Sequence, residues 1–532
     1  MTKKDNKYAL LSVFDKTGIV QLAKELVTLG FTIISTGGTA KILTENNIPI
    51  TPIQEITGNP ESFDGRMKTI SFQVESGLLF DRSNPKHVKE AKQLRIPSID
   101  LVACNLYPFE ATIRKKNVSL EEAIENIDVG GPTMIRAAAK NFKNVLVVVD
   151  PNDYNSVISY CHSEAKPKNL KRSFANAQDD IRMALAAKAF AHLSFYDAQI
   201  AKFFGQSPFP YTMTLPFRRT FSLRYGENPH QKAAVYFSPQ VNSPMANLKK
   251  AWGRELSHVN FTDINSGLES VRLFQEPAAV IIKHNCPCGI ALGKSADEAL
   301  KNAIAADPES AFGGIIVMNT PMTLKAAKEI GKFKDERRAN IDIVAVPAID
   351  KDALAFLQNV RKSMGIYTFG KIPKKSTDDM NIKWVDGGIV YQTGDLDIEK
   401  NFKDWKVVTK KKPSAKQISQ MKIAWKFISR IKSNAVIVVD KNLPMTRGIG
   451  TGQTSRIRST KIALSQAEGY TKGAILTSDS FFPFDDSVLL ASKSGIAAIV
   501  QQGGSINDQA SIDAADNAGM VMIFTGRRAF WH

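Results

Sequence analysis

Cysteine is scarce in this chain, with four residues among 532, namely Cys104, Cys161, Cys286 and Cys288. So few thiols argue against a disulfide framework, and we expect a protein of the reducing cytoplasm. Long apolar runs are also missing, since none approaches the roughly 20 residues that cross a bilayer. The apolar stretch after the basic N-terminus ends at Asp15, too early for the core of a signal peptide. We therefore expect no membrane partner.

Acidic residues are the second shortage, with 52 Asp and Glu against 70 Lys and Arg and a formal net charge of +18. A basic surplus suggests anionic partners, either nucleic acid or small phosphorylated and carboxylate-rich ligands. Aromatic residues do not recur between the basic ones at the spacing that stacked bases require. Lysine runs at residues 371–375 and 409–416 are more typical of solvated faces. Charge alone does not choose between the two kinds of partner.

The chain does contain apolar segments that alternate with helical patterns. Residues 8–13 and 31–35 resemble strands on either side of a helical repeat at residues 19–27. Residues 99–106 and 144–150 are further candidates for buried strands. Strands that alternate with helices form parallel sheets, so we predict a doubly wound α/β domain. Such domains bind ligands at the carboxyl ends of their strands.

Two turns at these expected strand ends offer hydroxyls, backbone N–H groups and a cation. Their residues are Ser12, Lys16, Thr17 and Gly18 in "SVFDKTG", and Thr36, Gly37, Gly38 and Thr39 in "STGGT". Each turn leads toward a helix, whose N-terminus carries partial positive charge, so each suits a phosphate. One "TGGT" alone is more often a simple tight turn, but two such turns on neighbouring strands favour phosphate binding.

Three further stretches, "GRMKT", "CNLYPF" and "IDVGGPTMIRAAAKN", place ionisable groups near predicted element ends. Four of these groups could form one polar site: Lys68, Tyr107, Asp128 and Lys140. Taken separately, each is more typical of a surface or helix-capping residue.

The stretch "KHNCPCG" (283–289) allows two interpretations. A metal would use His284, Cys286 and Cys288, but zinc sites usually space their cysteines as C-x₂₋₄-C and add a second pair, which is missing here. Alternatively, His284 takes a proton from an amine that attacks a carbonyl carbon, and Lys283 stabilises the oxyanion. For this dipeptide alone, a core histidine beside a solvated lysine is the commoner arrangement, because adjacent strand residues face opposite ways.

A proline-rich stretch at residues 205–219 is a good linker candidate, and residues 151–205 before it appear mostly helical. We predict two domains, at residues 1–204 (a core of about 1–150 plus the helical segment) and 205–532.

Motifs along nearly the whole chain resemble those of the bifunctional purine-biosynthesis enzymes that join phosphoribosylaminoimidazolecarboxamide (AICAR) formyltransferase to IMP cyclohydrolase. The first domain carries "LLSVFDKTG", "STGGTAK", "GRMKT", "ACNLYPF" and "IDVGGPTMIRAAAKN". The second carries "RYGENPHQ", "KHNCPCG", "SAFGGI", "GTGQTSR", "SDSFFPFDD" and "FTGRRAFWH". The resemblance implies an N-terminal methylglyoxal-synthase-like domain followed by two cytidine-deaminase-like α/β subdomains.

The resemblance implies that the second domain transfers a formyl group from 10-formyltetrahydrofolate to the 5-amino group of AICAR. His284 would be the base and Lys283 its partner. The nucleotide contacts would be Arg224, Tyr225, Asn434, Phe481, Arg528 and Phe530. The folate contacts would be Phe312, Gly313, Asp342, Gln453, Arg456 and Asp486.

The first domain would close formyl-AICAR to IMP with loss of water. Its proton-handling residues would be Lys68, Tyr107, Asp128 and Lys140, and Arg66, Thr69 and Asn105 would join the two Gly/Thr turns in binding substrate. The resemblance also implies a homodimer whose transformylase sites draw on both chains. The C-x-C spacing and the missing second ligand pair predict no catalytic metal, although the resemblance is compatible with a structural potassium ion. We also expect no nucleic-acid partner.

Several positions depart from the family pattern. After "GRMKT" the family has Leu-His-Pro and then a second His, whereas this chain has Ile-Ser-Phe at residues 70–72 and then Glu75. Since Glu75 adds negative charge near a phosphate-bearing substrate, we expect it to turn outward or to pair with a basic side chain. The stretches at 256–260 and 283–289 also differ, and Ala529 stands where a His is frequent.

Three functions remain open on the sequence. The first is the complete bifunctional enzyme, and the second is a transformylase with a weakened or inactive cyclohydrolase domain. The third is a basic RNA-binding protein on a reused enzyme scaffold, which would have no need of motifs such as "RYGENPHQ".

Overall fold

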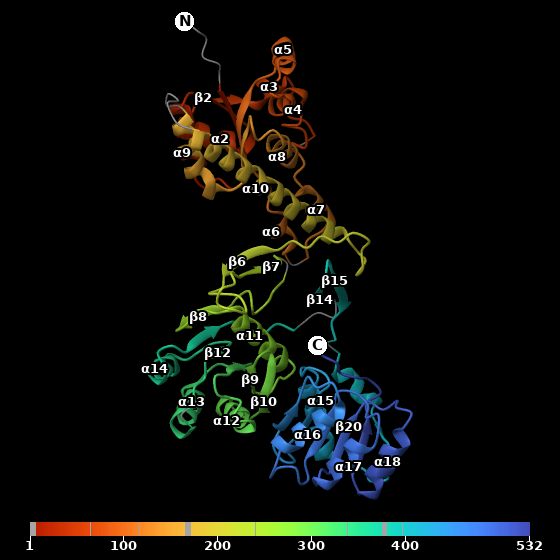
Figure 1. Ribbon diagram of the computed structural model, residues 1–532. Coiled ribbons are helices and arrows are strands. Elements are labelled where there is room, and N and C mark those ends of the chain that lie inside the picture. The colour runs from red at the N-terminus through yellow and green to blue at the C-terminus, as the bar shows by residue number, and fades with distance from the viewer. Residues whose placement is uncertain are drawn as a thin grey trace. The chain divides into compact units, whose positions relative to one another are not determined.

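A computed structural model describes the chain at residues 7–63, 65–115, 117–164, 172–239, 241–337, 339–374, 380–395 and 397–532. Two compact units make up the chain (Figure 1). Unit 1 comprises Met1–Arg218 with Ser238–Gln240, and unit 2 comprises Arg219–Phe237 with Val241–His532. Their boundary lies within the proline-rich stretch predicted as the linker.

Unit 1 is built on a five-stranded sheet in the order β3-β2-β1-β4-β5, with every pair parallel. The strands are β1 (Lys7–Val13), β2 (Phe31–Ser35), β3 (Ile50–Pro52), β4 (Ile99–Asn105) and β5 (Leu146–Val148). The predicted doubly wound parallel sheet is therefore confirmed. Strand β3 was not predicted from the sequence, because three residues are too few to show an apolar alternation.

Helices cover both faces of this sheet because the strand residues alternate between two cores. Ala9 and Leu11 of β1 pack with α1 (Ile19–Thr28), α2 (Gly37–Glu45) and α9 (Tyr154–Glu164). Leu10 packs on the other face with α4 (Phe72–Leu79), α8 (Gly130–Lys140) and α10 (Arg172–Phe204). The short helices are α3 (Ile53–Thr57), α5 (Pro85–Gln93), α6 (Phe109–Ile113) and α7 (Leu120–Glu125). No helix in the described ranges is long and apolar enough to cross a membrane.

Unit 2 contains two six-stranded sheets with the same topology. The first has the order β10-β9-β11-β12-β13-β8 and the second β18-β17-β19-β20-β21-β16 when both are written from the matching edge. In each sheet three neighbouring central strands are parallel and the remaining pairs are antiparallel. The predicted pair of α/β subdomains is thus a structural repeat, although the sequence contains no short repeat that would have indicated it.

The strands of the first sheet are β8 (Lys249–Trp252), β9 (Ala278–Lys283), β10 (Cys286–Leu292), β11 (Ile315–Met318), β12 (Ile343–Val346) and β13 (Gly365–Thr368). Those of the second are β16 (Lys406–Val407), β17 (Val436–Val439), β18 (Thr446–Gly450), β19 (Ile475–Ser478), β20 (Ala498–Gln501) and β21 (Val521–Phe524). Two hairpins stand apart from them, β6 (Arg218–Ser222) with β7 (Ala234–Phe237), and β14 (Met380–Val385) with β15 (Gly388–Thr393).

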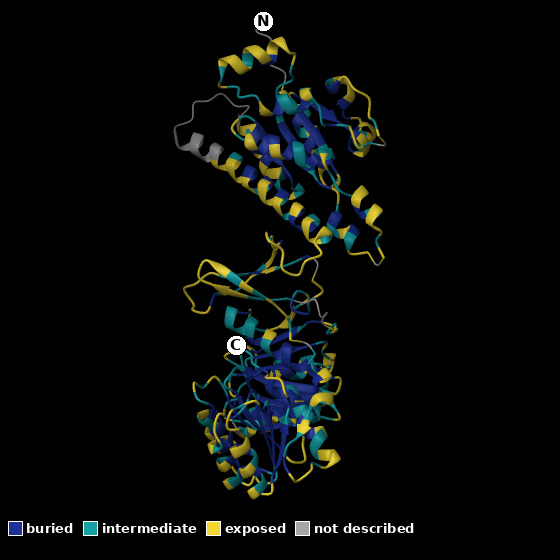
Figure 2. Cartoon of the chain, turned by 90° about the vertical axis from the view of Figure 1, so that its right-hand side faces the viewer, coloured by how far each residue is buried: buried dark blue, intermediate teal, exposed yellow. Residues whose placement is uncertain are grey.

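The two sheets of unit 2 share one core. In this core, α11 (His258–Val271) packs against the inner face of the first sheet and α15 (Ala415–Ile428) against the inner face of the second. The outer face of the first sheet is covered by α12 (Ala296–Ala306), α13 (Leu324–Arg337) and α14 (Lys351–Val360). The outer face of the second is covered by α16 (Arg456–Gln466), α17 (Asp486–Lys493) and α18 (Asp508–Asn517). Strands buried on both faces explain their continuous apolar runs (Figure 2).

Candidate functional site

The two predicted Gly/Thr turns lie side by side at the carboxyl edge of the unit 1 sheet. Thr39 joins them, because its Oγ1 accepts from the Val13 backbone N–H at 3.1 Å and donates to the Val13 carbonyl oxygen at 3.0 Å. Asn105, at the end of β4, accepts from the backbone N–H groups of Phe14 at 2.6 Å and Asp15 at 2.8 Å. Three strand ends therefore meet at one place.

Two lysines lie over the N-terminus of α2. A Cβ atom placed on Gly37 would lie 3.8 Å from Lys68 Nζ, and one on Gly38 would lie 3.9 Å from Lys16 Cε. Thr36, which precedes α2, is 8% exposed, and its hydroxyl has no hydrogen-bond partner in the described part of the chain. Two ammonium groups, a helix N-terminus and an unpartnered hydroxyl can together bind a phosphate.

The first turn is preorganised by local hydrogen bonds. The Thr17 backbone N–H donates to Asp15 Oδ1 at 2.9 Å, and Gly18 adopts a φ of 70° immediately before α1. Burial lowers the pKa of Lys16, an effect that the neighbouring Asp15 opposes. Ser12, near the end of β1, is half-buried.

Asp128 and Tyr107 meet beside the end of β4. Asp128 Oδ1 accepts from the Gly131 backbone N–H at 2.8 Å, and the Tyr107 backbone N–H also stabilises this carboxylate. Burial is the largest effect and raises the pKa of Asp128. The Tyr107 ring is exposed and contacts Phe14 at a centroid distance of 5.6 Å. A carboxyl group with a raised pKa can exchange a proton with a substrate bound at this edge.

Arg66 and Thr69 lie on the segment before α4. Arg66 forms an ion pair with Glu125. Thr69 is buried, and a Cβ atom on Gly130 would come within 2.6 Å of Thr69 Oγ1. This segment therefore packs against the N-terminus of α8, next to Asp128.

Lys140 is the predicted site residue that the structure does not bring to this edge. It is the exposed last residue of α8, whose first residue follows Asp128 closely. At a rise of about 1.5 Å per residue, the ends of α8 lie roughly 15 Å apart. The chain then enters β5 at Leu146, so Lys140 lies near the amino edge of the sheet. The predicted role of Lys140 in proton handling therefore rests on the resemblance alone.

The expectation that Glu75 turns outward or pairs with a basic side chain is wrong. Its Oε1 is buried and has no hydrogen-bond partner among the described residues. Burial alone raises the pKa of Glu75 to about 7. Glu75 lies in the first turn of α4, which Ser71 caps: Ser71 Oγ accepts from the Val74 backbone N–H at 3.1 Å. Ser71 stands where the family has a histidine. At position 71 the lost proton carrier is thus replaced by a helix cap.

We expect Glu75→Gln to stabilise the protein above pH 7. Because the folded-state pKa is raised, the Glu75 contribution to stability is fully present below the unfolded-state pKa of about 4.5 and is lost as pH rises through about 7. Allowing for solvent screening, the gain at pH 8 should be about 1–2 kcal/mol. Urea unfolding at pH 4.5 and pH 8 measures it, with Glu90→Gln, an exposed change on α5, as control. An equal effect of Glu75→Gln at both pH values would contradict a buried, titrating Glu75.

In unit 2, His284 lies on the hairpin turn between β9 and β10. Lys283 pairs with Cys286, so His284 and Asn285 form a two-residue turn. Their φ angles are 57° and 60°, as a type I′ turn requires. His284 is exposed, and the alternative of a core histidine is therefore wrong. A positive φ is uncommon for histidine, and such strain concentrates at functional sites.

Asp263 of α11 holds this turn and was missed by the sequence analysis. It is 4% exposed, and its Oδ1 accepts from the Asn285 backbone N–H at 2.6 Å. Burial raises the pKa of Asp263, while hydrogen bonds to Asn285 and the charge of His284 oppose that rise. Ser266, one helical turn later, bonds Asn285 Oδ1 at 3.1 Å. No sequence signal connects Asp263 to the motif, because the contact spans two elements.

The predicted folate residues of the first sheet gather near Lys283. Lys283 Nζ donates to the carbonyl oxygen of Phe312 at 2.9 Å, and the Phe312 ring is 51% exposed. Gly313 has a φ of 73°, and the Asp342 backbone N–H donates to Gly314 at 3.0 Å. The Asp342 carboxylate lies between two arginines, Arg361 at 2.7 Å and Arg254 at 3.0 Å.

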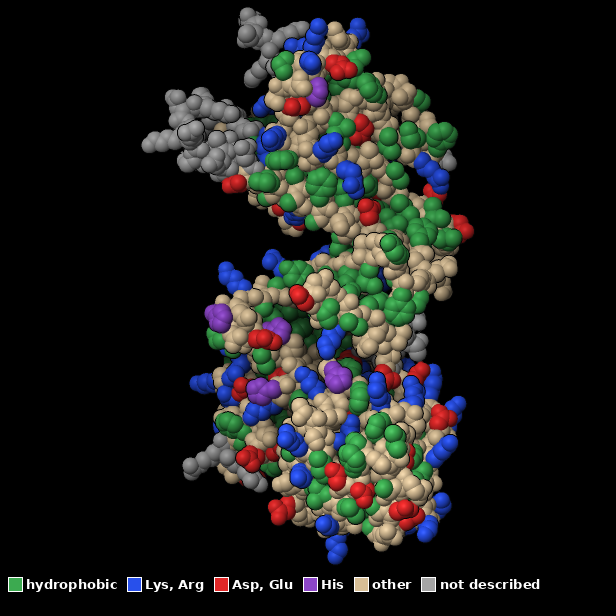
Figure 3. All heavy atoms as spheres, turned by 45° about the vertical axis from the view of Figure 1, so that its right-hand side comes forward, with side chains coloured by type: hydrophobic (Ala, Val, Ile, Leu, Met, Phe, Trp, Pro, Cys, Tyr) green, Lys and Arg blue, Asp and Glu red, His purple; other side chains and the backbone are tan. Residues whose placement is uncertain are grey.

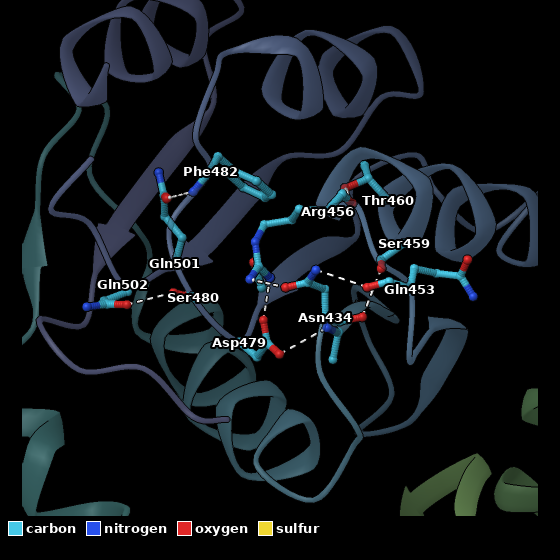
Figure 4. Close-up of polar contacts among 12 residues, drawn as sticks. Asn434, Gln453, Arg456, Ser459, Thr460, Asp479, Ser480, Phe482, Gln501 and Gln502 are labelled. Carbon is cyan, nitrogen blue, oxygen red and sulfur yellow. Dashed lines mark hydrogen bonds and ion pairs between the residues drawn. The ribbon is translucent and has the colours of Figure 1, made fainter. Parts of the chain in front are cut away.

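A polar network holds the predicted residues of the second sheet (Figure 4). Arg456 forms a buried ion pair with Asp479, and its Nη2 donates to Asn434 Oδ1 at 2.8 Å. Asp479 Oδ2 accepts from the Ala435 backbone N–H at 3.0 Å. Asn434 Nδ2 donates to the Gln453 carbonyl oxygen at 2.9 Å. Arg456, the first residue of α16, therefore fixes the carboxamide of Asn434.

The His284 turn and this network are close in unit 2. Cys286 Sγ lies 4.0 Å from the hydroxyl of Thr451, which donates to the Lys432 carbonyl oxygen at 2.9 Å. Asn434 lies two residues after Lys432, and its Nδ2 donates to the carbonyl oxygen of Gln453, which lies two residues after Thr451. Residues 165 positions apart in the sequence therefore lie close together in unit 2.

The C-terminal residues complete this side of the second sheet. The Ala529 backbone N–H donates to the Asp479 carbonyl oxygen at 2.7 Å, and the Arg528 guanidinium lies 4.5 Å from the centre of the Phe530 ring. Phe481 is half-buried two residues after Asp479, and Asp486 is the exposed first residue of α17.

Arg224 and Tyr225 lie on the loop between β6 and β7. The Arg224 Nη2 donates to Tyr225 Oη at 2.9 Å, and the Tyr225 carbonyl oxygen accepts from the His258 backbone N–H at 3.0 Å. This contact places the pair at the N-terminus of α11, the helix that carries Asp263.

The described residues contain no group of three or more His, Cys, Asp or Glu side chains that could hold a metal ion. Burial raises the pKa of Cys288 to about 12, so its thiol stays protonated and is a poor metal ligand. His284 and Lys283 at this turn offer a group for proton transfer and a cation for oxyanion stabilisation.

Comparisons with known proteins find similar sequences along almost the whole chain. The profile described as AICARFT/IMPCHase bienzyme matches residues 138–466, and the MGS-like domain profile matches residues 18–133. The chain is 44% identical to the bifunctional purine biosynthesis protein PurH of Thermoanaerobacter sp. (strain X514), covering 99% of this chain and 100% of that protein. It is 42% identical to the protein of the same name from Persephonella marina (strain DSM 14350 / EX-H1), covering 98% and 99%. The crystal structure of ForH is 34% identical, with a TM-score of 0.32, and covers 38% of this chain and 100% of its own.

Proposed function

The chain belongs to the AICARFT/IMPCHase bienzyme family, and we propose that it carries out the two reactions at the two sites described above. It is a bifunctional enzyme of purine biosynthesis, a formyltransferase and an IMP cyclohydrolase. It formylates the 5-amino group of AICAR from 10-formyltetrahydrofolate and closes the formyl-AICAR to IMP. Its N-terminal unit is the methylglyoxal-synthase-like domain.

The formyl transfer is assigned to the His284 turn. His284 removes a proton from the 5-amino group as the nitrogen attacks the formyl carbon, and Lys283 stabilises the oxyanion that forms. Collapse of the oxyanion breaks the bond between the formyl carbon and N10, and the leaving tetrahydrofolate takes up a proton at N10. Asp263 positions the turn through its bond to Asn285. The observation that carries the assignment is an exposed histidine held at positive φ beside the Asn434 network.

Ring closure is assigned to the carboxyl edge of the unit 1 sheet. The phosphate of formyl-AICAR would bind over the N-terminus of α2, between Lys16 and Lys68. Asp128 and Tyr107, at the neighbouring strand end, would then handle the protons that leave with water. The site lacks the two family histidines. We still expect it to catalyse ring closure, because the reaction depends on positioning of the substrate as much as on acid–base catalysis.

The remaining partners are small anionic molecules and a second copy of the chain. The excess of Lys and Arg over Asp and Glu would attract the phosphate of AICAR and the carboxylates of the folate. On the face that Figure 3 shows, Lys and Arg are mixed with acidic and apolar side chains, and such a mixed face does not favour RNA binding there. A homodimer is supported by the exposure of several assigned groups in the single chain, His284, Phe312 and Arg528 among them. All four cysteines are free, which supports a cytoplasmic location.

We expect chelation to leave both activities unchanged, because the assigned steps use only protein groups. The measurement is elemental analysis together with assays before and after dialysis against EDTA. About one tightly held zinc per chain, with activity lost on chelation, would overturn this part of the proposal. A potassium ion held by carbonyl oxygens is compatible with it.

The test of the function is an absorbance assay with AICAR and 10-formyltetrahydrofolate, with the products separated by chromatography. IMP is the expected product. Conversion only as far as formyl-AICAR, even with excess enzyme, would show that the cyclohydrolase site is inactive. Nucleic-acid binding with a steep salt dependence and no saturable AICAR binding would favour the RNA-binding alternative.

A further inference from the structure

A small basic cavity lies at the amino edge of the unit 1 sheet, away from the assigned substrate turns. Its volume is about 190 Å³. Its lining residues are Lys7, Phe31, Arg82, Asp100, Lys143, Asn144, Leu146 and Arg182. Four of them are cations and one is a carboxylate, so the lining carries a formal charge of +3.

The cavity lies far from the substrate turns. Lys7 begins β1, and the first substrate turn follows Val13 at the other end of that strand. At about 3.3 Å per residue, the two positions lie roughly 20 Å apart. Neither assigned reaction uses any residue that lines this cavity.

The arginines of the cavity are held in place before any ligand binds. Arg82 pairs with Asp100 at 2.6 Å, and its Nη2 donates to the Ile99 carbonyl oxygen at 2.6 Å. Asp100 Oδ2 in turn accepts from the Tyr8 backbone N–H at 2.9 Å, which ties β1 to β4. The Arg182 Nε donates to Tyr160 Oη at 2.6 Å, and its guanidinium lies 5.2 Å from the centre of that ring.

One donor in the cavity is unsatisfied. The Arg82 Nε is buried and has no hydrogen-bond partner among the described residues. Burial lowers the pKa of Arg82, and the charge of Arg182 adds to that effect while Asp100 opposes it. Like charges held together and a buried donor without an acceptor both cost stability, and one anion would relieve both.

The size of the cavity limits the anion. A volume of about 190 Å³ is below the roughly 300 Å³ at which pockets for whole organic ligands begin. Arginine forks and lysine ammonium groups suit the oxygens of a tetrahedral dianion. We propose that this cavity is a second anion site of unit 1, which binds inorganic phosphate or the phosphate group of a small monoester.

The test must separate this site from the substrate turns, which also suit phosphate. The protein is therefore the full-length chain with Lys16→Gln and Lys68→Gln, titrated with inorganic phosphate and with glycerol 3-phosphate by calorimetry. We expect saturable binding of at least one of them. Adding Lys7→Gln and Lys143→Gln, two exposed positions of the cavity, should weaken that binding by about tenfold or more, as expected for lost charge-assisted contacts.

The matched control adds Lys301→Gln and Lys472→Gln, exposed positions of unit 2 that remove the same charge and should leave the affinity unchanged. Preference for one titrant identifies whether free phosphate or a monoester is the ligand. The proposal is overturned if neither titrant binds, if the Lys7 and Lys143 changes have no effect, or if the control weakens binding equally. Since formyl transfer and ring closure are not measured, these outcomes are independent of the proposed function.

Discussion

Replacing His284 by asparagine is expected to lower the rate of formyl transfer by roughly 10²-fold or more, the usual cost of losing a general base. Asparagine is the informative replacement because it tolerates the left-handed backbone conformation of the turn better than alanine does. The φ of 57° at His284 and the bond from Asn285 to Asp263 should therefore persist. The measurement is the steady-state rate of formyl-AICAR formation by purified protein.

The same variant contains its own control. Cyclisation of added formyl-AICAR takes place at the unit 1 site, so His284→Asn should leave that rate unchanged. A loss of both activities would indicate a folding defect, which thermal unfolding would reveal. If His284→Asn transfers formyl groups at nearly the wild-type rate, then His284 is not the base.

Replacing Lys68 by alanine should reduce ring closure by roughly 10²-fold, as expected when one preorganised charge is removed from a reacting site. Lys68 Nζ lies near Gly37 at the N-terminus of α2 and pairs with Glu61 at 2.7 Å. A phosphate bound there would compete with Glu61 for the ammonium group. The measurement is the rate of IMP formation from added formyl-AICAR, with formyl transfer expected to be intact.

Two comparisons make the Lys68 result specific. Glu61→Gln keeps the ammonium group and removes only its carboxylate partner, so it should change ring closure far less. Lys24→Ala, an exposed position on α1, removes an equal charge elsewhere in unit 1 and should have no effect. If the Lys68→Ala enzyme cyclises formyl-AICAR as fast as wild type, then Lys68 has no role in ring closure.

Much of the fold could be predicted because it depends on local patterns. The apolar runs of β1, β2 and β4 and the helical repeat of α1 are contiguous in the chain, and parallel strands then follow from their alternation. The repeat within unit 2 could not be seen in this way. The same topology needs only apolar strands and helices in the same order, and different side chains satisfy that requirement equally well.

Individual motifs could be recognised by their residue types, but the residues that contact each motif in the folded chain could not be predicted. The sequence suggested Lys68 and Asp128 as polar site residues, and the fold placed both at one sheet edge. The same fold separated Lys140 from them, because an α-helix of 11 residues carries its two ends to opposite edges of the sheet. Burial of Glu75 was also invisible, since exposure on one helix face depends on what packs against it.

The sequence by itself determined the family, the presence of two reactions and the types of residue at the two sites, because contiguous motifs are enough to identify all three. Only the tertiary structure decided that His284 sits on a strained hairpin turn, that Asp263 holds this turn, and that Asn434 lies nearby. The physical reason is that each of these contacts joins elements far apart in the chain. Packing of the two halves of unit 2 around one shared core brings them together, and no local pattern records that packing.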